Sequence, residues 1–219
     1  MTDVIIIGAG GHAAEIDEYI LHSQKTSGKR EINVIGFLDD KPANYYDRYK
    51  FSAPLLGGIK DHVVEKRHGY IISIADVEFR RPIVDWFLAE GGFFVSFIHY
   101  SAYVSKSALI GEGTIIGPNV NIGPNVKVGK YNLFNSRCSL GHDSIVGDYN
   151  IISPNVCFSG FTQVGNENLF GINSATIPHI KVGNLNKIAA GMIIDQNIGH
   201  DSVFFHRFKE KIIALKIGK

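Results

Sequence analysis

A histidine followed directly by an aspartate, His142 and Asp143, is the pair in this chain best suited to acid-base chemistry. A carboxylate beside an imidazole can fix its tautomer and stabilise the imidazolium that forms when the ring accepts a proton. His142 lies two places after an apolar residue, Leu140, at a predicted corner, so we expect its side chain to face outward. The alternative is that His142 is an ordinary solvated corner residue.

A second group of candidate residues lies near the N-terminus. The apolar run Val4 to Ile7 leads into the turn Gly8 to His12 and then into a helical pattern, and such a turn lets a phosphate approach the N-terminus of the helix. A second apolar run, 33–38, ends in Asp39 and Asp40, whose carboxylates can reach a ribose or a base. The spacing from Gly8 to Asp39 is longer than the usual dinucleotide pattern. Gly10, Gly11, Asp39 and Asp40 are therefore candidates for binding a nucleotide.

The element that must position His142 is a repeat of six residues. This period is foreign to a helix but divides evenly by the two of a strand, so it predicts short strands separated by turns. A glycine often follows the apolar position, and we expect it to supply unusual backbone angles at a corner. The repeated positions are Val104, Ile110, Ile116, Ile122, Val128, Phe134, Leu140, Val146, Ile152, Phe158, Val164, Phe170, Thr176, Val182, Ile188 and Ile194.

Three hexapeptides make one triangular coil of eighteen residues. At this period Thr114 is followed by four asparagines, which predicts a ladder of side-chain hydrogen bonds along the axis. The same spacing places Gly160 one coil from His142. The asparagines are Asn132, Asn150, Asn168 and Asn186.

The N-terminal part reads as an α/β half-domain. We expect strands at 4–7, 33–38 and 70–74, and helices after Ala13, at 61–68 and at 77–90. A full dinucleotide domain has about six strands, so half a domain is the better fit. The predicted boundaries are 1–98 for the nucleotide-binding domain, 99–194 for the β-helix and 195–219 for a tail that caps the last coil.

The composition limits the choice of partners and location. The 22 basic and 21 acidic residues nearly balance, which argues against nucleic acid or an anionic membrane as the main partner. No apolar run reaches the length of a membrane span, and we expect no signal peptide. Cys138 is predicted to face inward and Cys157 outward, so we expect free thiols and a cytoplasmic location.

The repeat resembles the hexapeptide-repeat acyltransferases, and the whole layout resembles the bacterial nucleotide-sugar acetyltransferases that include bacillosamine N-acetyltransferases and sialic-acid O-acetyltransferase relatives. The likeness covers residues 1 to about 194. It implies a left-handed parallel β-helix that works as a homotrimer. The motifs that carry it are the Gly8 to His12 turn, Gly36-Phe37-Leu38-Asp39-Asp40, Ile98-His99-x-Ser101-Ala102, and Asn135 to Gly160 around His142.

The resemblance also assigns roles to residues of the repeat. It implies that His142 is the general base, that the Gly160 N–H binds a thioester carbonyl, and that Asn135 contacts the acceptor. A structural turn residue is an equal alternative for Asn135. The family often has a second histidine nine residues after the first, where this chain has Ile151.

Three further residues keep two interpretations each. The resemblance implies that His12 contacts substrate, although His12 could instead cap its own helix. Lys181 and Lys187 could meet the phosphates of coenzyme A, or could be solvated lysines on the coil.

The implied function is acetyl-CoA-dependent N-acetylation of a nucleotide-linked amino sugar, a UDP- or dTDP-amino-dideoxyhexose used for surface glycans, without a metal. Three alternatives remain. One is O-acetylation of a sialic-acid type of sugar, and another is a non-catalytic trimeric scaffold that binds nucleotide. The third is a zinc hydratase, which needs three converging histidines, whereas His142 and His179 are one residue off the stacking multiple.

Overall fold

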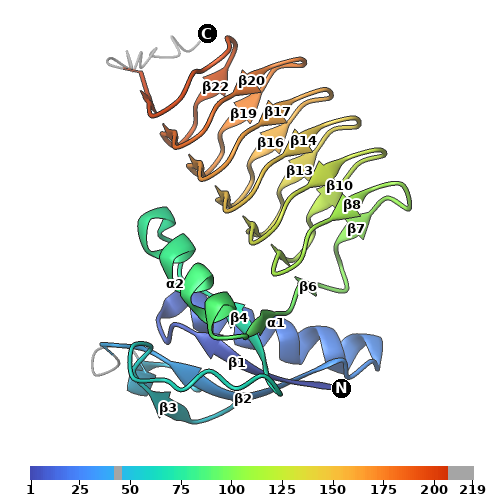
Figure 1. Cartoon of the computed structure of the whole chain (residues 1–219). Helices are drawn as coiled ribbons and strands as arrows, with labels where there is room; N and C mark the ends of the chain where they lie inside the picture. Colours follow the sequence, from blue (N-terminus) through green and yellow to red (C-terminus); the bar gives the residue numbers. More distant parts are fainter. Residues whose placement is uncertain (42–45, 207–219) are drawn as a thin grey trace, which may run out of the picture.

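The chain folds into an α/β domain followed by a three-sided β-helix (Figure 1). The computed structural model describes residues 1–41 and 46–206. The predicted tail beyond residue 206 therefore lies outside the described residues.

The N-terminal sheet has five parallel strands in the order β3-β2-β1-β4-β5. The three predicted strands are present, and β3 and β5 extend the sheet at its two edges. The strands are β1 (Thr2–Ile7), β2 (Ile32–Leu38), β3 (Leu55–Gly57), β4 (Gly69–Ile72) and β5 (Phe93–Phe94).

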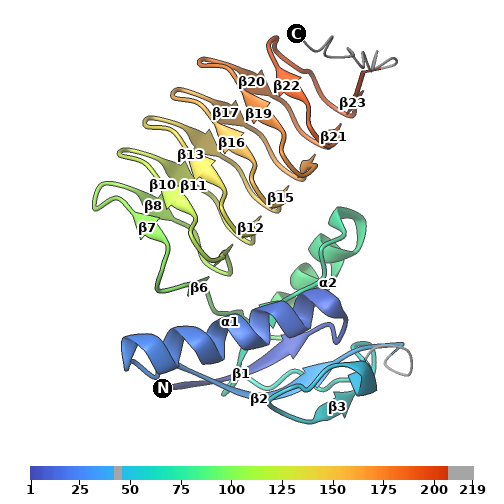
Figure 2. The same ribbon diagram turned by 180° about the vertical axis from the view of Figure 1, so that it is seen from behind.

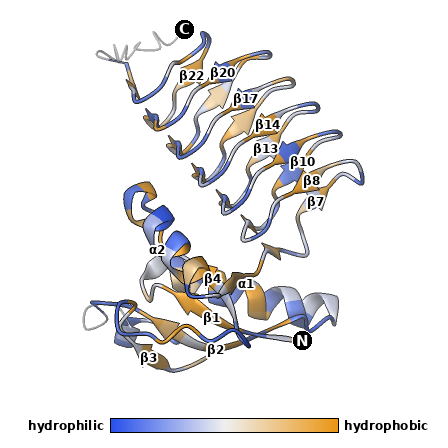
Figure 3. Ribbon diagram, viewed as in Figure 1, coloured by the Kyte–Doolittle hydropathy of each residue, from blue (hydrophilic) through white to orange (hydrophobic). Residues whose placement is uncertain are grey.

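Two helices cover opposite faces of this sheet. Alternate residues of β1 point to opposite sides, so Val4 and Ile6 pack against α1 (Gly11–Ser27), while Ile5 and Ile7 pack against α2 (Val77–Ala89). Figure 3 shows the apolar colour on β1 and β4, between the two helices. The sheet is thus buried on both faces, as its unbroken apolar runs predict.

The prediction of a helix at 61–68 is wrong, because these residues form turns between β3 and β4. Val63 is 80% exposed, so the segment has no apolar stripe that a helix could bury. The hydroxyl of Tyr70 instead accepts a hydrogen bond from the Glu65 N–H, at 2.9 Å, and lies 3.0 Å from His62 Nε2. A 3-10 helix, η2 (Tyr46–Arg48), was not predicted.

The solenoid has three faces, each a parallel sheet of two-residue strands that pair eighteen residues apart. The first face comprises β7 (Tyr103–Val104), β10 (Asn121–Ile122), β13 (Ser139–Leu140), β16 (Cys157–Phe158), β19 (Ala175–Thr176) and β22 (Ile193–Ile194). The second comprises β8 (Leu109–Ile110), β11 (Lys127–Val128), β14 (Ile145–Val146), β17 (Gln163–Val164) and β20 (Lys181–Val182). The third comprises β6 (Phe97–Ile98), β9 (Ile115–Ile116), β12 (Leu133–Phe134), β15 (Ile151–Ile152), β18 (Leu169–Phe170), β21 (Lys187–Ile188) and β23 (Val203–Phe204).

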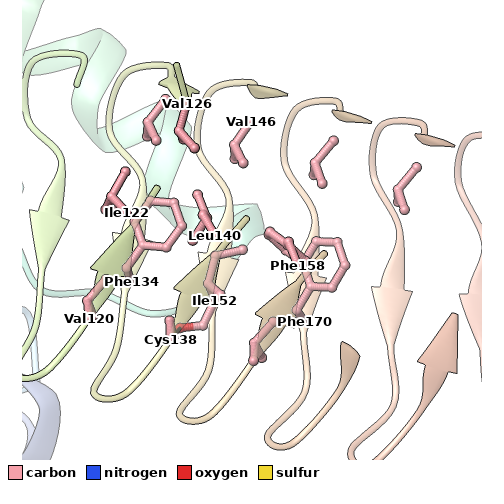
Figure 4. Packing of buried hydrophobic residues seen from close by; sticks show 14 of the residues in the cluster. Val120, Ile122, Val126, Phe134, Cys138, Leu140, Val146, Ile152, Phe158 and Phe170 are labelled. Carbon is pink, nitrogen blue, oxygen red and sulfur yellow. Dashed lines mark hydrogen bonds between the residues drawn. The ribbon is translucent and has the colours of Figure 1, made fainter. Parts of the chain in front are cut away.

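The second residue of each strand points into the solenoid. Phe134, Leu140, Ile152 and Phe158 meet there in one continuous apolar core (Figure 4). This confirms the six-residue periodicity and, with it, the predicted fold class, a Rossmann-like α/β half-domain followed by a left-handed β-helix of hexapeptide repeats.

The glycines that follow the apolar positions do not serve the role predicted for them. The left-handed angles occur two residues further on, for example at Asn119 with φ 56° and Asn125 with φ 57°. Gly117 and Gly123 have ordinary angles, but a Cβ on either would lie about 3 Å from the backbone of the next coil. These glycines therefore allow neighbouring coils to approach closely.

The predicted asparagine ladder is confirmed. Each of its asparagines is fully buried, and the side-chain oxygen of one accepts hydrogen bonds from the backbone N–H and the side-chain amide of the next. Between Asn132 and Asn150 these bonds measure 2.8 and 3.1 Å. The Asn150 amide also donates to the Gly165 carbonyl, at 2.9 Å. The ladder thus fixes the register of consecutive coils.

The α/β domain packs directly on the third face. The outward residues Ile115, Leu133 and Ile151 are buried in one cluster with the apolar side of α1. Figure 2 shows β12, β15 and β21 on the side of the solenoid that lies next to α2. The fully buried guanidinium of Arg80, on α2, donates to the carbonyl of Ile72 and to that of Tyr131 in the solenoid. These contacts join the two parts without a flexible linker.

The last described residues continue the solenoid as a partial coil. β23 pairs with β21, and Phe204 packs against the core. This segment covers part of the end of the solenoid, as the predicted cap would.

The buried ladder yields the first prediction. Asn150→Ala leaves the Asn168 backbone N–H and the Gly165 carbonyl without partners, at a cost of about 1–3 kcal/mol for each group that remains unsatisfied. We expect a lower melting temperature and denaturation midpoint. Gln163→Ala, at an exposed position of β17, is the control and should change stability by less than about 0.5 kcal/mol. Equal stability of the two variants would contradict a structural role for the ladder.

Candidate functional site

His142 lies outside the solenoid, at the corner between β13 and β14, as predicted. Its side chain is 57% exposed, and its Nδ1 lies 2.8 Å from Asp143 Oδ2. Asn125, one coil earlier, donates its side-chain amide to Asp143 Oδ1 at 3.0 Å. The hydrogen bonds from His142 and then Asn125 lower the pKa of Asp143, so the carboxylate is an acceptor and Nδ1 carries the proton. This tautomer leaves the lone pair of Nε2 available to accept another proton.

Gly160 lies immediately beside the imidazole, one coil further along. A Cβ at this position would come within 2.9 Å of His142 Nε2. The backbones are joined at the same place, because the Phe161 N–H donates to the His142 carbonyl at 3.0 Å. The absence of a side chain at Gly160 therefore leaves room for the His142 ring and for a small group next to Nε2.

Two aromatic residues lie at this corner: Phe161, which was not identified from the sequence, and His179, which was given no role here. The ring of Phe161 contacts His142 edge to face, with centroids 5.1 Å apart, and is stacked on His179 at 4.7 Å. All three side chains are exposed. Phe161 occupies the same corner position as Asn125 and Asp143 in the two preceding coils, eighteen residues apart. A bulky aromatic residue where the earlier coils have Asn and Asp is the signal that could have revealed it.

The N-terminal turn is held by the first acidic residue after β2. The Ala9 N–H donates to Asp39 Oδ2 at 2.8 Å, and the Lys41 N–H donates to Asp39 Oδ1 at 2.7 Å. Gly8 has φ 105°, and a Cβ there would collide with Ser73. The predicted glycine turn and Asp39 therefore come together at the carboxyl end of the sheet.

A cavity of about 560 Å³ lies between the chain that follows β2 and helix α2. Asp40 lies at its rim and also accepts a hydrogen bond from the Lys60 N–H at 3.1 Å. Trp86 and Phe79 supply aromatic surface, and Lys41 and Lys60 supply positive charge. The aromatic rings can stack on a planar base, and the two lysines can meet a neighbouring phosphate.

His12 does not cap its helix. The N-cap is Gly10, which makes no side-chain hydrogen bond, and His12 Nδ1 instead lies 3.1 Å from Glu15 Oε2. His12 Nε2 is buried without a partner among the described residues. Tyr49 covers the same turn, because a Cβ on Gly11 would lie 3.0 Å from its hydroxyl.

Asn135 lies at a different corner, between β12 and β13. Its side-chain oxygen accepts a hydrogen bond from the Ser136 N–H at 2.6 Å, which is the turn geometry that the sequence left as one alternative. Its amide nitrogen remains available for a ligand.

The two candidate lysines lie on different faces. Lys181 is exposed on β20, two residues after His179, and is thus on the His142 side of the solenoid. Lys187 is on the third face, where its Nζ pairs with Glu78 of α2 at 3.1 Å. The structure does not bring Lys187 together with Gly160.

The corner that carries His142 is opposite the third face, which the α/β domain covers. The glycine turn, Asp39 and the cavity at Asp40 therefore lie on one side of the chain, and the His142 corner lies on another. Within one chain the structure does not bring the nucleotide-binding candidates and His142 together.

The described residues hold neither a cluster of metal-binding side chains nor a membrane-spanning helix. Residues 1–41 and 46–206 contain no group of three or more His, Cys, Asp or Glu side chains that could hold a metal ion. Within the same ranges, no helix has the length and apolar character needed to cross a membrane.

Comparison with known proteins gives matches to both parts. Residues 3–87 match the model of the PglD N-terminal domain. A search of curated proteins finds no match. Among solved structures, the chain resembles the acetyltransferase domain of PglB from Neisseria gonorrhoeae FA1090, with 24% identity, a TM-score of 0.79, and coverage of 93% of this chain and 96% of the other.

Two other structures are similar over the same length. A mutant of perosamine N-acetyltransferase from Caulobacter crescentus, in complex with CoA and GDP-perosamine, has a TM-score of 0.80 at 23% identity and covers 93% of each chain. WeeI from Acinetobacter baumannii AYE has a TM-score of 0.79 at 17% identity and covers 93% of this chain and 96% of its own. At these identities the matches establish the shared fold, an N-terminal α/β domain joined to a β-helix.

The contact between Gly160 and His142 gives the second prediction. Gly160→Ala should displace the imidazole, because the added Cβ would lie 2.9 Å from Nε2. NMR of the His142 ring protons is expected to show a clear change in chemical shift with little loss of stability. Gly199→Ala, where nothing lies within 4 Å of the added Cβ, is the control. Unchanged His142 signals in the Gly160 variant would refute the described packing.

Proposed function

We propose that this protein is an acetyl-CoA-dependent N-acetyltransferase that acts on a nucleotide-linked amino sugar used for surface glycans. The observation that carries the proposal is the arrangement of His142, Asp143 and Gly160 at one open corner of a β-helix that is joined to a nucleotide-binding type of domain. Structures with this fold include enzymes crystallised with acetyl coenzyme A and with CoA and GDP-perosamine.

The geometry fits each step of acyl transfer. Nε2 of His142 takes a proton from the acceptor amine as nitrogen attacks the thioester carbonyl, while Asp143 stabilises the resulting imidazolium. The backbone N–H of Gly160 donates to the oxygen on which negative charge develops. The tetrahedral intermediate then collapses with release of the CoA thiolate, which takes up a proton. The residues named in these steps need no metal.

The acceptor nucleotide fits the other part of the chain. We place its base in the cavity at Asp40 and its phosphates near Gly10 and Gly11, at the N-terminus of α1. In this placement the unpartnered Nε2 of His12 would be available to the phosphates or to the sugar. A screen of UDP-, dTDP- and GDP-linked amino sugars with acetyl-CoA, monitoring free thiol, would identify the acceptor.

We further propose a homotrimer in which each active site is shared by two chains. His142 lies away from the α/β domain of its own chain, so a neighbouring chain must bring its bound acceptor to this corner. The first face suits such an assembly, because its outward residues are small or uncharged: Tyr103, Asn121, Ser139, Cys157, Ala175 and Ile193. In this arrangement Asn135 of one chain would approach His142 of the next, and Lys181 lies on the side where coenzyme A would bind.

The same site could acetylate a sugar hydroxyl, because a histidine base also deprotonates an alcohol. The match to the PglD N-terminal domain and the amino-sugar complex of a structural neighbour favour the amine. A scaffold without activity would bind nucleotide but release no thiol from acetyl-CoA. A cytoplasmic location is part of the proposal and fits the free thiols of Cys138 and Cys157.

The third prediction concerns the base. His142→Ala should lower kcat by about 10²–10⁴, the contribution of general-base catalysis. The rate should be measured at saturating acetyl-CoA and acceptor, with trimer mass and melting temperature as controls for folding.

Asp143→Asn keeps the left-handed backbone at this corner and should lower kcat by less than His142→Ala does, because an amide stabilises the imidazolium less well than a carboxylate but leaves the base in place. A folded His142→Ala variant within a few-fold of the wild type would exclude His142 as a rate-determining base.

The fourth prediction tests whether the site is shared. His142→Ala and Asp39→Asn should each be nearly inactive at a low acceptor concentration, since the first lacks the base and the second binds the acceptor weakly. Co-expression in equal amounts forms mixed trimers, in which about one site in four combines an intact His142 with an intact Asp39 from different chains. Activity should therefore return to about a quarter of the wild-type value. Sites contained within single chains would give no recovery.

A further inference from the structure

Phe161 is the one exposed aromatic side chain in contact with His142 in the described part of the chain, and the proposed chemistry has not used it. It occupies a left-handed corner position with φ 59° and is 42% exposed. A bulky residue rarely adopts this backbone conformation, which asparagine tolerates much better. An exposed, unfavourable aromatic residue beside the proposed base suggests that it is kept for function.

Three other bulky residues at left-handed corners have contacts that account for them, whereas Leu185 is exposed like Phe161. Tyr131 and Tyr149 are buried beneath the α/β domain, and Arg137 donates to Asn155 at 2.7 Å. The contacts of Phe161 are instead with the two histidines of its own corner. Its ring lies between the edge-to-face contact with His142 and the stacking contact with His179, with an interplanar angle of 5° in the second case.

His142 needs such support because it is an exposed side chain on an outward corner. The hydrogen bond to Asp143 fixes one side of the imidazole through Nδ1, but it does not by itself prevent rotation of the ring about that contact. Gly160 provides no side chain on the opposite side. Within residues 1–41 and 46–206, the aromatic ring packed on the imidazole is that of Phe161, and it limits the movement of the imidazole.

We propose that Phe161 is a positioning residue that holds the His142 imidazole with Nε2 directed at the acceptor, and that His179 fixes the Phe161 ring by stacking. The proposal rests on the function proposed above, since it assigns a task to Phe161 in that same site. In this role Phe161 acts through His142 and touches neither substrate. The left-handed backbone conformation of Phe161 is strained, so the folded corner is less stable than it would be with asparagine.

The test replaces Phe161 by the residue that the corner prefers. Phe161→Asn removes the ring but suits φ 59°, so the melting temperature should stay the same or rise. We expect kcat to fall by about 10- to 100-fold, as for a misplaced catalytic group, with the KM for acetyl-CoA unchanged. Phe161→Tyr keeps the ring and should retain kcat within a few-fold. NMR should show the His142 ring protons losing the ring-current shift in the asparagine variant and keeping it in the tyrosine variant.

Leu185→Asn is the matched control. Leu185 has φ 62° and is 52% exposed, but it lies at another corner. It should show the same effect on melting temperature and none on kcat.

Three results would overturn the proposal. The first is an asparagine variant with wild-type kcat. The second is a rise in the KM for acetyl-CoA with kcat unchanged, which would make Phe161 a donor contact. The third is an unshifted His142 signal. If the wild type itself transfers no acetyl group to any acceptor, the proposed function fails, and the NMR comparison still decides whether Phe161 positions His142.

Discussion

The buried hydrogen bonds between consecutive asparagines fix the register of the coils, and the arrangement of the outer corners depends on that register. Each bond ties one coil to the next at a fixed register, in a core where an unpaired amide would be costly. Because the register is fixed inside, the corners outside can vary freely in sequence. Asp143, Gly160 and Phe161 are thus brought next to His142 by the core, although none of them contributes to it.

The same constraint separates the two halves of the proposed reaction. The third face is used to bind the α/β domain through α1, α2 and the buried Arg80. The corner with His142 is then directed away from that domain. A rigid chain of this kind places the proposed base and the proposed nucleotide site in different directions, so assembly rather than flexibility would have to unite them.

Much of this fold is predictable from the sequence because its periods are simple. The six-residue apolar repeat and the eighteen-residue asparagine column need only strand geometry, and His142 with Asp143 is visible as adjacent residues. The role of the repeat glycines was misassigned because close approach and left-handed angles both favour glycine, and the sequence does not separate them. The turns at 61–68 depend on the side chain of Tyr70, whose hydroxyl accepts from the Glu65 N–H, and the packing of Phe161 depends on His142 and His179 in neighbouring coils. Neither set of contacts follows from an apolar periodicity.

The solenoid also sets the distance between the α/β domain and each corner in fixed steps. Neighbouring parallel strands lie about 4.8 Å apart, so the height of any corner above the α/β domain changes only in steps of that size. Insertion or removal of one eighteen-residue coil before β10 would move His142 by one such step, and would leave intact the contacts of His142 with Asp143, Gly160 and Phe161 and that of Asp143 with Asn125. Acceptors of different length could therefore be matched by counting coils, without any change in the residues that carry out the chemistry.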